Sequence, residues 1–163
     1  MLHGKECLSF ENGAFHWLDY YTESMMSLNI SNETYKRIPL PKNVCLSPGK
    51  HNWDVTIEMG ISILGSMLCV FNNNEITFNL WIIKEYGVQD SWTKLLTLPS
   101  NGANSIVPIY SFSYGKVLLQ YENWRDDKPH IIYRIGEDRI WPFDCNDIDS
   151  LSFFMDGFVY TES

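Results

Sequence analysis

The alternation of apolar and polar residues along this chain indicates short β-strands rather than helices. No window longer than about ten residues repeats apolar side chains at the three- and four-residue spacing of an amphipathic helix. Instead, short apolar runs such as 67–71 and 117–119 are bounded by glycine, proline, asparagine and aspartate. Aromatic and β-branched side chains inside such runs suit the pleated surface of a sheet. The pattern therefore predicts an all-β protein.

The runs fall into blocks of similar plan, each opened by a glycine. These blocks occupy residues 13–41, 65–99 and 115–143, with a partial fourth at 153–163. The opening glycines are Gly13, Gly65, Gly115 and Gly157, at intervals of 52, 50 and 42 residues. A period of about 40 to 50 residues, with three or four strands in each unit, is typical of propeller blades. We expect a partial, kelch-like β-propeller of about three to four blades; one β-sandwich with long hairpins is the alternative.

Such a propeller would have an open end. Propellers typically close with about four to eight blades, so we expect the domain over residues 1–163 to be truncated at its N-terminus. Each blade has an apolar face that it cannot bury alone, and neighbouring blades stack against it.

Composition narrows the choice of partners. The formal net charge is −8 and no basic run occurs, which disfavours nucleic acid. No apolar stretch approaches the length of a membrane helix or a signal segment, so we expect an intracellular protein of the cytoplasm or nucleus. The four cysteines are widely spaced, without a zinc or redox pair, and Cys69 is predicted to be a buried, reduced thiol.

Candidate catalytic and metal-binding chemistry is sparse. The four histidines are dispersed, and His16 is interpreted as a strand residue of a core hairpin. The segment 144–149 carries calcium-compatible oxygens, but it lacks the glycine and distal glutamate of an EF-hand loop, and a solvated acidic turn is the simpler interpretation. No phosphate loop or nucleophile elbow occurs. We therefore expect no cofactor, no metal and no catalytic residue; a propeller-type enzyme or a sugar-binding protein is a remote alternative.

Loops carry binding on rigid β-scaffolds, so the candidate contact residues are sought there. The predicted loop 121–128 is polar and holds aromatic and guanidinium side chains, which are common in binding hot spots. The candidates for protein binding are Tyr121, Trp124 and Arg125. Trp81 is expected to be a core residue, and Trp92 is expected to hold adjacent blades together.

Several ordered stretches resemble the plant F-box associated domain. They are NGAFHWL (12–18), SLNI with ETYKRIPLP (27–41), LGSMLCV (64–70) and WIIKEYGV with SWTKL (81–95). The resemblance extends from about residue 10 to the end of the chain. It implies an F-box/kelch-like protein whose repeat domain captures the target of a Skp1–cullin–F-box (SCF) ubiquitin ligase.

The resemblance also defines what to expect of partners. In that family an F-box precedes the repeats and docks on a Skp1-type adaptor, and no such segment precedes residue 12 here. The implied partner is therefore a target protein for ubiquitination, and an adaptor only through the missing F-box. The alternative is a non-functional or regulatory fragment that binds targets without recruiting the ligase.

Overall fold

A computed structural model describes residues 8–42, 44, 58–74, 76–100, 102–112, 115–122, 130–134 and 140–143. Of residues 112, 121–122, 130–134 and 140–143 it describes the backbone alone. Within these ranges the protein is all-β, with twelve strands, one 3₁₀ turn and no α-helix.

The strands form three antiparallel sheets of four strands each. The first sheet contains β1 (Ser9–Glu11), β2 (Ala14–Asp19), β3 (Ser24–Asn29) and β4 (Thr34–Ile38). The second contains β5 (Glu58–Leu64), β6 (Met67–Asn73), β7 (Thr77–Ile83) and β8 (Trp92–Pro99), with the 3₁₀ turn η1 (Gln89–Ser91) before β8. The third contains β9 (Ser105–Phe112), β10 (Lys116–Glu122), β11 (His130–Arg134) and β12 (Ile140–Phe143). In every sheet the strands lie side by side in chain order.

Each sheet begins one strand earlier than the glycine that was predicted to open it. Gly13, Gly65 and Gly115 lie in the turns that follow the first strands β1, β5 and β9, at φ values of 73°, 63° and 71°. A positive φ is accessible to glycine without the steric cost that a Cβ brings, which explains glycine at these turns. The predicted fourth block, with Gly157, lies outside the described residues.

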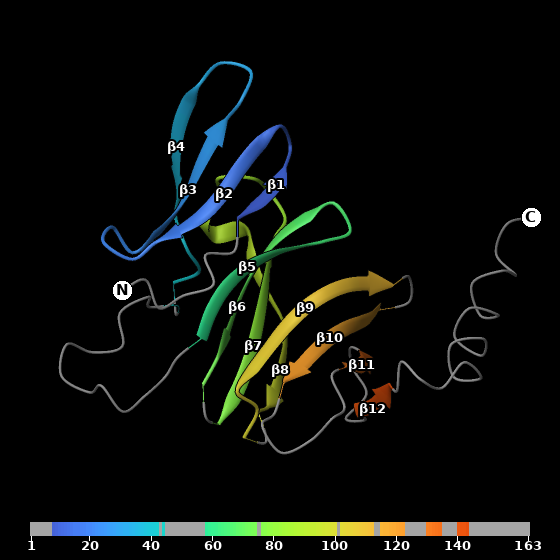
Figure 1. Cartoon of the computed structure of the whole chain (residues 1–163). Coiled ribbons are helices and arrows are strands. Elements are labelled where there is room, and N and C mark those ends of the chain that lie inside the picture. Colours follow the sequence, from blue (N-terminus) through green and yellow to red (C-terminus); the bar gives the residue numbers. More distant parts are fainter. Residues whose placement is uncertain are drawn as a thin grey trace, which may run out of the picture.

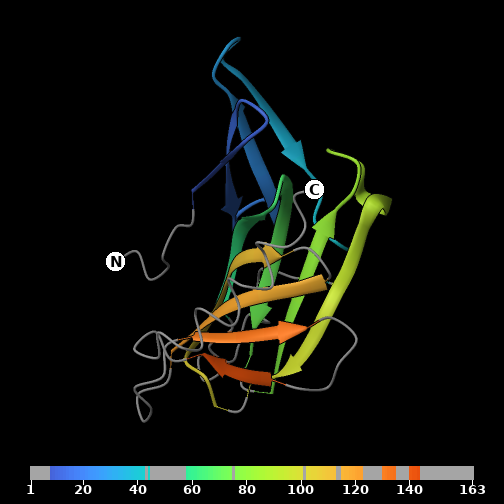
Figure 2. The same ribbon diagram turned by 90° about the vertical axis from the view of Figure 1, so that its right-hand side faces the viewer.

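The three sheets stack face against face, and Figures 1 and 2 show the second sheet between the other two. Their first strands lie closest to one another, because β5 contacts both β1 and β9. None of the sheets closes on itself, so the described residues form an open stack and not a barrel.

The second sheet is apolar on both faces, as expected for a sheet covered on each side. Along β6, Leu68 and Val70 pack against Met25 and Ile38 of the first sheet. The alternate residue Phe71 faces the third sheet. Strand β6 is therefore an almost unbroken apolar run, since both of its faces are buried.

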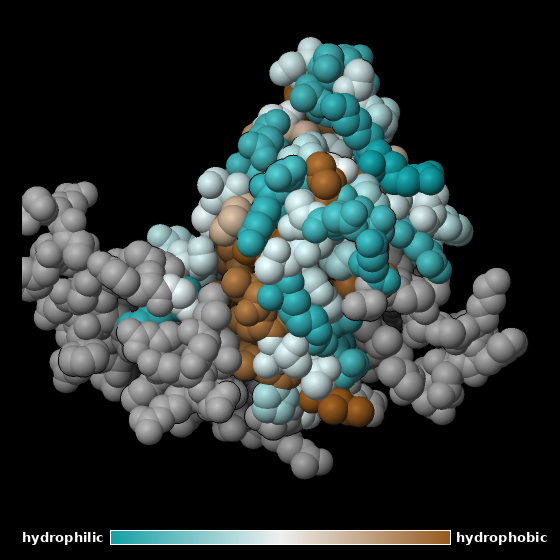
Figure 3. All heavy atoms as spheres, turned by 180° about the vertical axis from the view of Figure 1, so that it is seen from behind, coloured by the Kyte–Doolittle hydropathy of each residue, from teal (hydrophilic) through white to brown (hydrophobic). Residues whose placement is uncertain are grey.

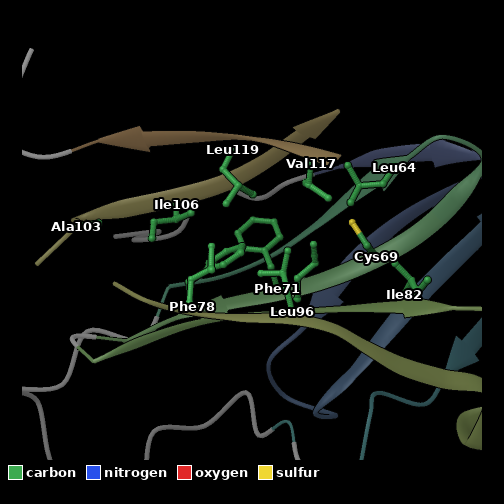
Figure 4. Close-up of a cluster of buried hydrophobic side chains, with 12 residues drawn as sticks. Leu64, Cys69, Phe71, Phe78, Ile82, Leu96, Ala103, Ile106, Val117 and Leu119 are labelled. Atoms are coloured by element: carbon green, nitrogen blue, oxygen red, sulfur yellow. The ribbon is translucent and has the colours of Figure 1, made fainter. Parts of the chain in front are cut away.

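The largest apolar cluster lies between the second and third sheets. In Figure 4, Phe71 and Phe78 occupy its middle, and Val117 and Leu119 approach them from β10. The two phenyl rings lie with their centroids 6.0 Å apart. Gly60 of β5 leaves room for the Phe71 ring, which a Cβ at that position would overlap.

Candidate protein-binding surface

The sequence-predicted contact residues are placed only in part. Tyr121 lies in strand β10 and pairs with Ile106 of β9, so the expected loop does not begin at Tyr121. The reason is that the backbone of β10 stays paired with β9 as far as Glu122, which lies opposite Ser105. Trp124 and Arg125 lie outside the described residues, in the connection between β10 and β11.

The same connection is described in the other two sheets, apart from residue 75, and it exposes large hydrophobic side chains. In a four-stranded meander the turn between the second and third strands lies at the end opposite the two remaining hairpin turns. In the first sheet this turn carries Tyr21, which is 100% exposed, and Tyr20, which is 49% exposed. In the second sheet it carries Ile76, which is 77% exposed. A hydrophobic side chain stands out at the lower end of Figure 3, the end at which the β6–β7 turn lies in Figure 1.

Each of the two turns is stabilised by a side-chain oxygen from the residue at its start, Asp19 at the end of β2 and Asn74 directly after β6. In the β2–β3 turn, one Asp19 carboxylate oxygen accepts from the Tyr21 amide at 3.0 Å, and the other accepts from the Thr22 hydroxyl at 2.7 Å. The Thr22 hydroxyl donates the bond that contributes most to lowering the pKa of Asp19, and the Tyr21 amide adds to it. Asp19 therefore stays ionised and keeps the turn closed at neutral pH.

The β6–β7 turn uses an asparagine for the same purpose. The Asn74 side-chain oxygen accepts from the amides of Ile76 at 2.9 Å and Thr77 at 2.6 Å. Such Asx turns order a short loop through its backbone amides, so the side chains of Tyr21 and Ile76 are not needed to close it. In both turns the residue two positions after the acceptor, Tyr21 or Ile76, projects into solvent. An apolar tip on a rigid turn loses little conformational entropy on binding, which suits it to contact a protein.

The long β7–β8 loop, in contrast, contacts another sheet through one side chain. The Tyr86 hydroxyl lies 2.7 Å from His16 Nε2 of β2 and 2.7 Å from Ser27 Oγ of β3. The His16 and Tyr86 rings meet edge to face, with centroids 5.6 Å apart. This contact makes Tyr86 an inter-sheet residue.

Two further residues of the same region reach the segment that leaves β4. Gln89 donates to the Leu40 carbonyl at 3.0 Å, and the Trp92 indole donates to the Pro39 carbonyl at 2.8 Å. The predicted role of Trp92 in holding adjacent units together is confirmed. Because Pro39 and Leu40 follow the last strand of the first sheet, these bonds fix that sheet against the second. We call Tyr86, Gln89 and Trp92 the sheet clip.

His16 is a buried part of this contact, with 0% exposure, which agrees with its predicted place in a strand. Its Nδ1 has no hydrogen-bond partner among the described residues. Burial lowers the pKa of His16, while the Ser9 backbone and the Glu11 charge act in the opposite direction to a smaller extent. The ring is therefore neutral at pH 7, and it contacts Tyr86 across the two sheets.

Other sequence expectations concern single residues. Trp81 is 6% exposed, so its predicted core position is confirmed, and the Lys94 ammonium lies 5.0 Å from the centre of its ring. Cys69 is a buried free thiol whose pKa is raised to about 12 by burial. No group of three or more metal-ligating side chains occurs in the part of the chain that the structure describes. The acidic segment 144–149 lies outside that part.

A search for helices able to cross a membrane finds none in the described ranges. No model of a protein family matches the chain, and no solved structure matches it. The chain is 25% identical over 138 residues to F-box protein CPR1 of Arabidopsis thaliana. The match covers 80% of this chain and 30% of the relative, so the chain spans under a third of that protein's length. The chain is thus similar to part of a plant F-box protein.

Proposed function

We propose that this chain is the target-binding part of a plant F-box protein, a subunit of an SCF-type ubiquitin ligase. The observation that carries the proposal is the similarity to an F-box protein over 80% of the chain. The relation favours a protein-binding role without catalysis, and the absence of a metal-ligating cluster in the described residues is compatible with it.

In this proposal the three sheets are blades of a β-propeller. Two features support that interpretation. Each sheet is a four-stranded meander, and the first strands of successive sheets contact one another, as innermost strands do around a propeller axis. The blades correspond to the predicted units near 13–41, 65–99 and 115–143.

The target protein would bind the turns that join the second and third strands of the blades. The described tips there are Tyr20, Tyr21 and Ile76, and the sequence places Trp124 and Arg125 in the equivalent connection of the third sheet. Exposed tyrosine, tryptophan and arginine are the residue types that most often dominate binding energy.

The test compares the chain alone with the chain joined behind a Skp1-binding F-box, both expressed in plant cells. Proteins that bind the chain alone should become ubiquitinated and decrease in amount when the F-box is present, and this decrease should stop under proteasome inhibition. The chain alone should not bind a Skp1-type adaptor. Equal amounts of every bound protein with and without the F-box would contradict the ligase role.

A double variant tests the surface. Tyr21→Ser with Ile76→Ser changes two exposed tips, so the fold should be retained while bound proteins are lost. The matched control is Met67→Ser, an exposed apolar residue at the start of β6, the end of that strand opposite the β6–β7 turn. Loss of binding with the control and not with the double variant would place the binding surface elsewhere.

A further inference from the structure

The second strand of each sheet carries a repeated packing pattern. In the third sheet, the second and fourth residues of β10, Val117 and Leu119, face the preceding sheet and are 0% and 2% exposed. In the second sheet, the corresponding residues of β6, Leu68 and Val70, face the preceding sheet and are 2% and 0% exposed. The same face of each sheet is therefore built to be covered by a neighbouring sheet.

The first sheet has the same face, and no described residue covers it. The corresponding residues of β2 are Phe15 and Trp17, which are only partly buried. The strand register places four side chains in one row across all four strands: Phe10, Phe15, Leu28 and Tyr35. Phe10 is 51% and Tyr35 is 64% exposed. We call this row, together with Trp17, the aromatic face.

The side chains of the aromatic face are already ordered by contacts with one another. The Phe10 and Phe15 rings lie with centroids 5.0 Å apart, and the Trp17 and Tyr35 rings meet edge to face at 6.3 Å. Large rings held in place lose little side-chain entropy on association. A continuous apolar row of this extent on a sheet marks an interaction surface.

The two interfaces inside the chain indicate what fits this face. At each interface, the face that carries the second and fourth residues of the second strand packs on the preceding sheet. The preceding sheet contributes its other face. The outward face of the third sheet is the one that a following sheet would cover. It carries the half-buried Leu118, which is paired with Tyr110, a residue 52% exposed. A second copy of the chain offers that face.

We propose that the aromatic face binds the outward side of the third sheet in a second copy of this chain. Two copies would then make two identical contacts and join their six described sheets in one ring, a number within the range of about four to eight units that closed propellers use. Three copies would exceed that range. The contact is head-to-tail, and closure by a two-fold axis prevents growth into a filament.

The first test measures the mass of the complete chain in solution by light scattering during size-exclusion chromatography over a range of concentrations. A dimer is expected. Trp17→Asp and Tyr35→Asp should each raise the dimer dissociation constant roughly thirtyfold or more, the effect of losing one interface hot spot. Tyr35 is exposed in the protomer, so its variant should fold even if Trp17→Asp does not. Tyr21→Asp, at a fully exposed turn outside the face, is the control and should leave the dimer unchanged.

A monomer at all concentrations, or a dimer that is insensitive to both variants, would overturn the proposal. The measurement involves neither a target protein nor an adaptor, so its failure would leave the proposed ligase role untouched.

The second test distinguishes head-to-tail from face-to-face pairing by disulfide formation. The parent carries Ser at Cys7, Cys45 and Cys145 and keeps Cys69, whose buried thiol does not react. Phe10→Cys, on the aromatic face in β1, and Tyr110→Cys, on the outward face in β9, are then made separately, because first strands lie closest to one another at both interfaces inside the chain. A mixture of the two variants should form a disulfide-linked dimer, whereas each variant alone should not. Linkage of Phe10→Cys to itself would show that the aromatic faces meet each other and would overturn the head-to-tail arrangement.

Discussion

The two interfaces of the second sheet are held by different kinds of interaction. Towards the third sheet, the contact is one apolar cluster centred on Phe71 and Phe78. Towards the first sheet, a smaller apolar cluster around Met25 and Val70 is accompanied by the sheet clip, whose bonds are directional. Apolar burial is non-directional and supplies most of the stability, whereas hydrogen bonds add little net energy but require one geometry.

The difference indicates a division of roles. The cluster between the second and third sheets should dominate the free energy of unfolding. The clip should instead fix where the first sheet sits, and it should be sensitive to the loss of a single polar atom. Substitutions in the two interfaces test this contrast, beginning with the largest effect.

Removing the Phe71 ring should destabilise the protein more than any change to the clip. Its side chain is 1% exposed and lies in the largest apolar cluster. Phe71→Ala is expected to lower the free energy of unfolding by about 3–5 kcal/mol, the range for a buried phenylalanine. Urea denaturation followed by tryptophan fluorescence measures the change. Ile76→Ala, at a side chain 77% exposed, is the control and should be nearly neutral. Similar losses for the two variants would show that this interface does not dominate stability.

Removing one hydroxyl should weaken the clip. Tyr86→Phe leaves His16 Nε2 and Ser27 Oγ without the partner that lies 2.7 Å from each. The expected loss is about 1–3 kcal/mol, the cost of leaving buried polar groups unpaired. Tyr21→Phe removes the same atom from a fully exposed side chain and should change nothing measurable. If Tyr86→Phe matched this control, the clip would contribute no stability.

Lowering the pH should weaken the contact between Tyr86 and His16, because His16 becomes protonated more readily in the unfolded chain. The unfolded ring titrates near its usual pKa of about 6.5, whereas burial lowers the pKa in the folded protein. Between those two values the unfolded chain binds more protons, so the stabilisation present above pH 6.5 is lost as the pH falls towards the folded-state pKa. The free energy of unfolding should therefore decrease from about pH 7 to about pH 5, and the decrease should be smaller in His16→Gln. The other three histidines are common to both proteins. Equal slopes would exclude His16 as the titrating group.

The sequence predicted those parts of the fold that depend on local patterns. Strand β4 (Thr34–Ile38) ends immediately before Pro39, as expected for short runs bounded by proline. Cys69 and Trp81 are buried as predicted from the apolar runs around them. Strand β1, with three residues, is too short for alternation to reveal it, and it was missed. Gly13, Gly65 and Gly115 occur once in each sheet, but each follows the first strand of its sheet instead of opening the sheet.

The candidate binding turns and the clip could be predicted less well, and the clip in particular depends on contacts between residues far apart in the sequence. Nothing in the local sequence around Tyr86 links it to the first sheet, yet its hydroxyl contacts residues 59 and 70 positions away. The exposed tips Tyr20, Tyr21 and Ile76 gave no signal that separated them from strand residues. Asp19 and Asn74, which lie two residues before Tyr21 and Ile76, are the signal that could have identified those turns.

The smallest effect should come from the ion pair beside the clip. Lys42 Nζ lies 2.7 Å from an Asp90 carboxylate oxygen, but the two side chains are 69% and 77% exposed. The bond raises the pKa of Lys42, yet water and salt screen such an exposed pair, and holding two long side chains in one geometry costs entropy. Lys42→Ala should therefore leave urea denaturation unchanged at both low and high salt. A clear loss that disappears at high salt would mean that charge, and not the neutral bonds of Tyr86, Gln89 and Trp92, positions the first sheet.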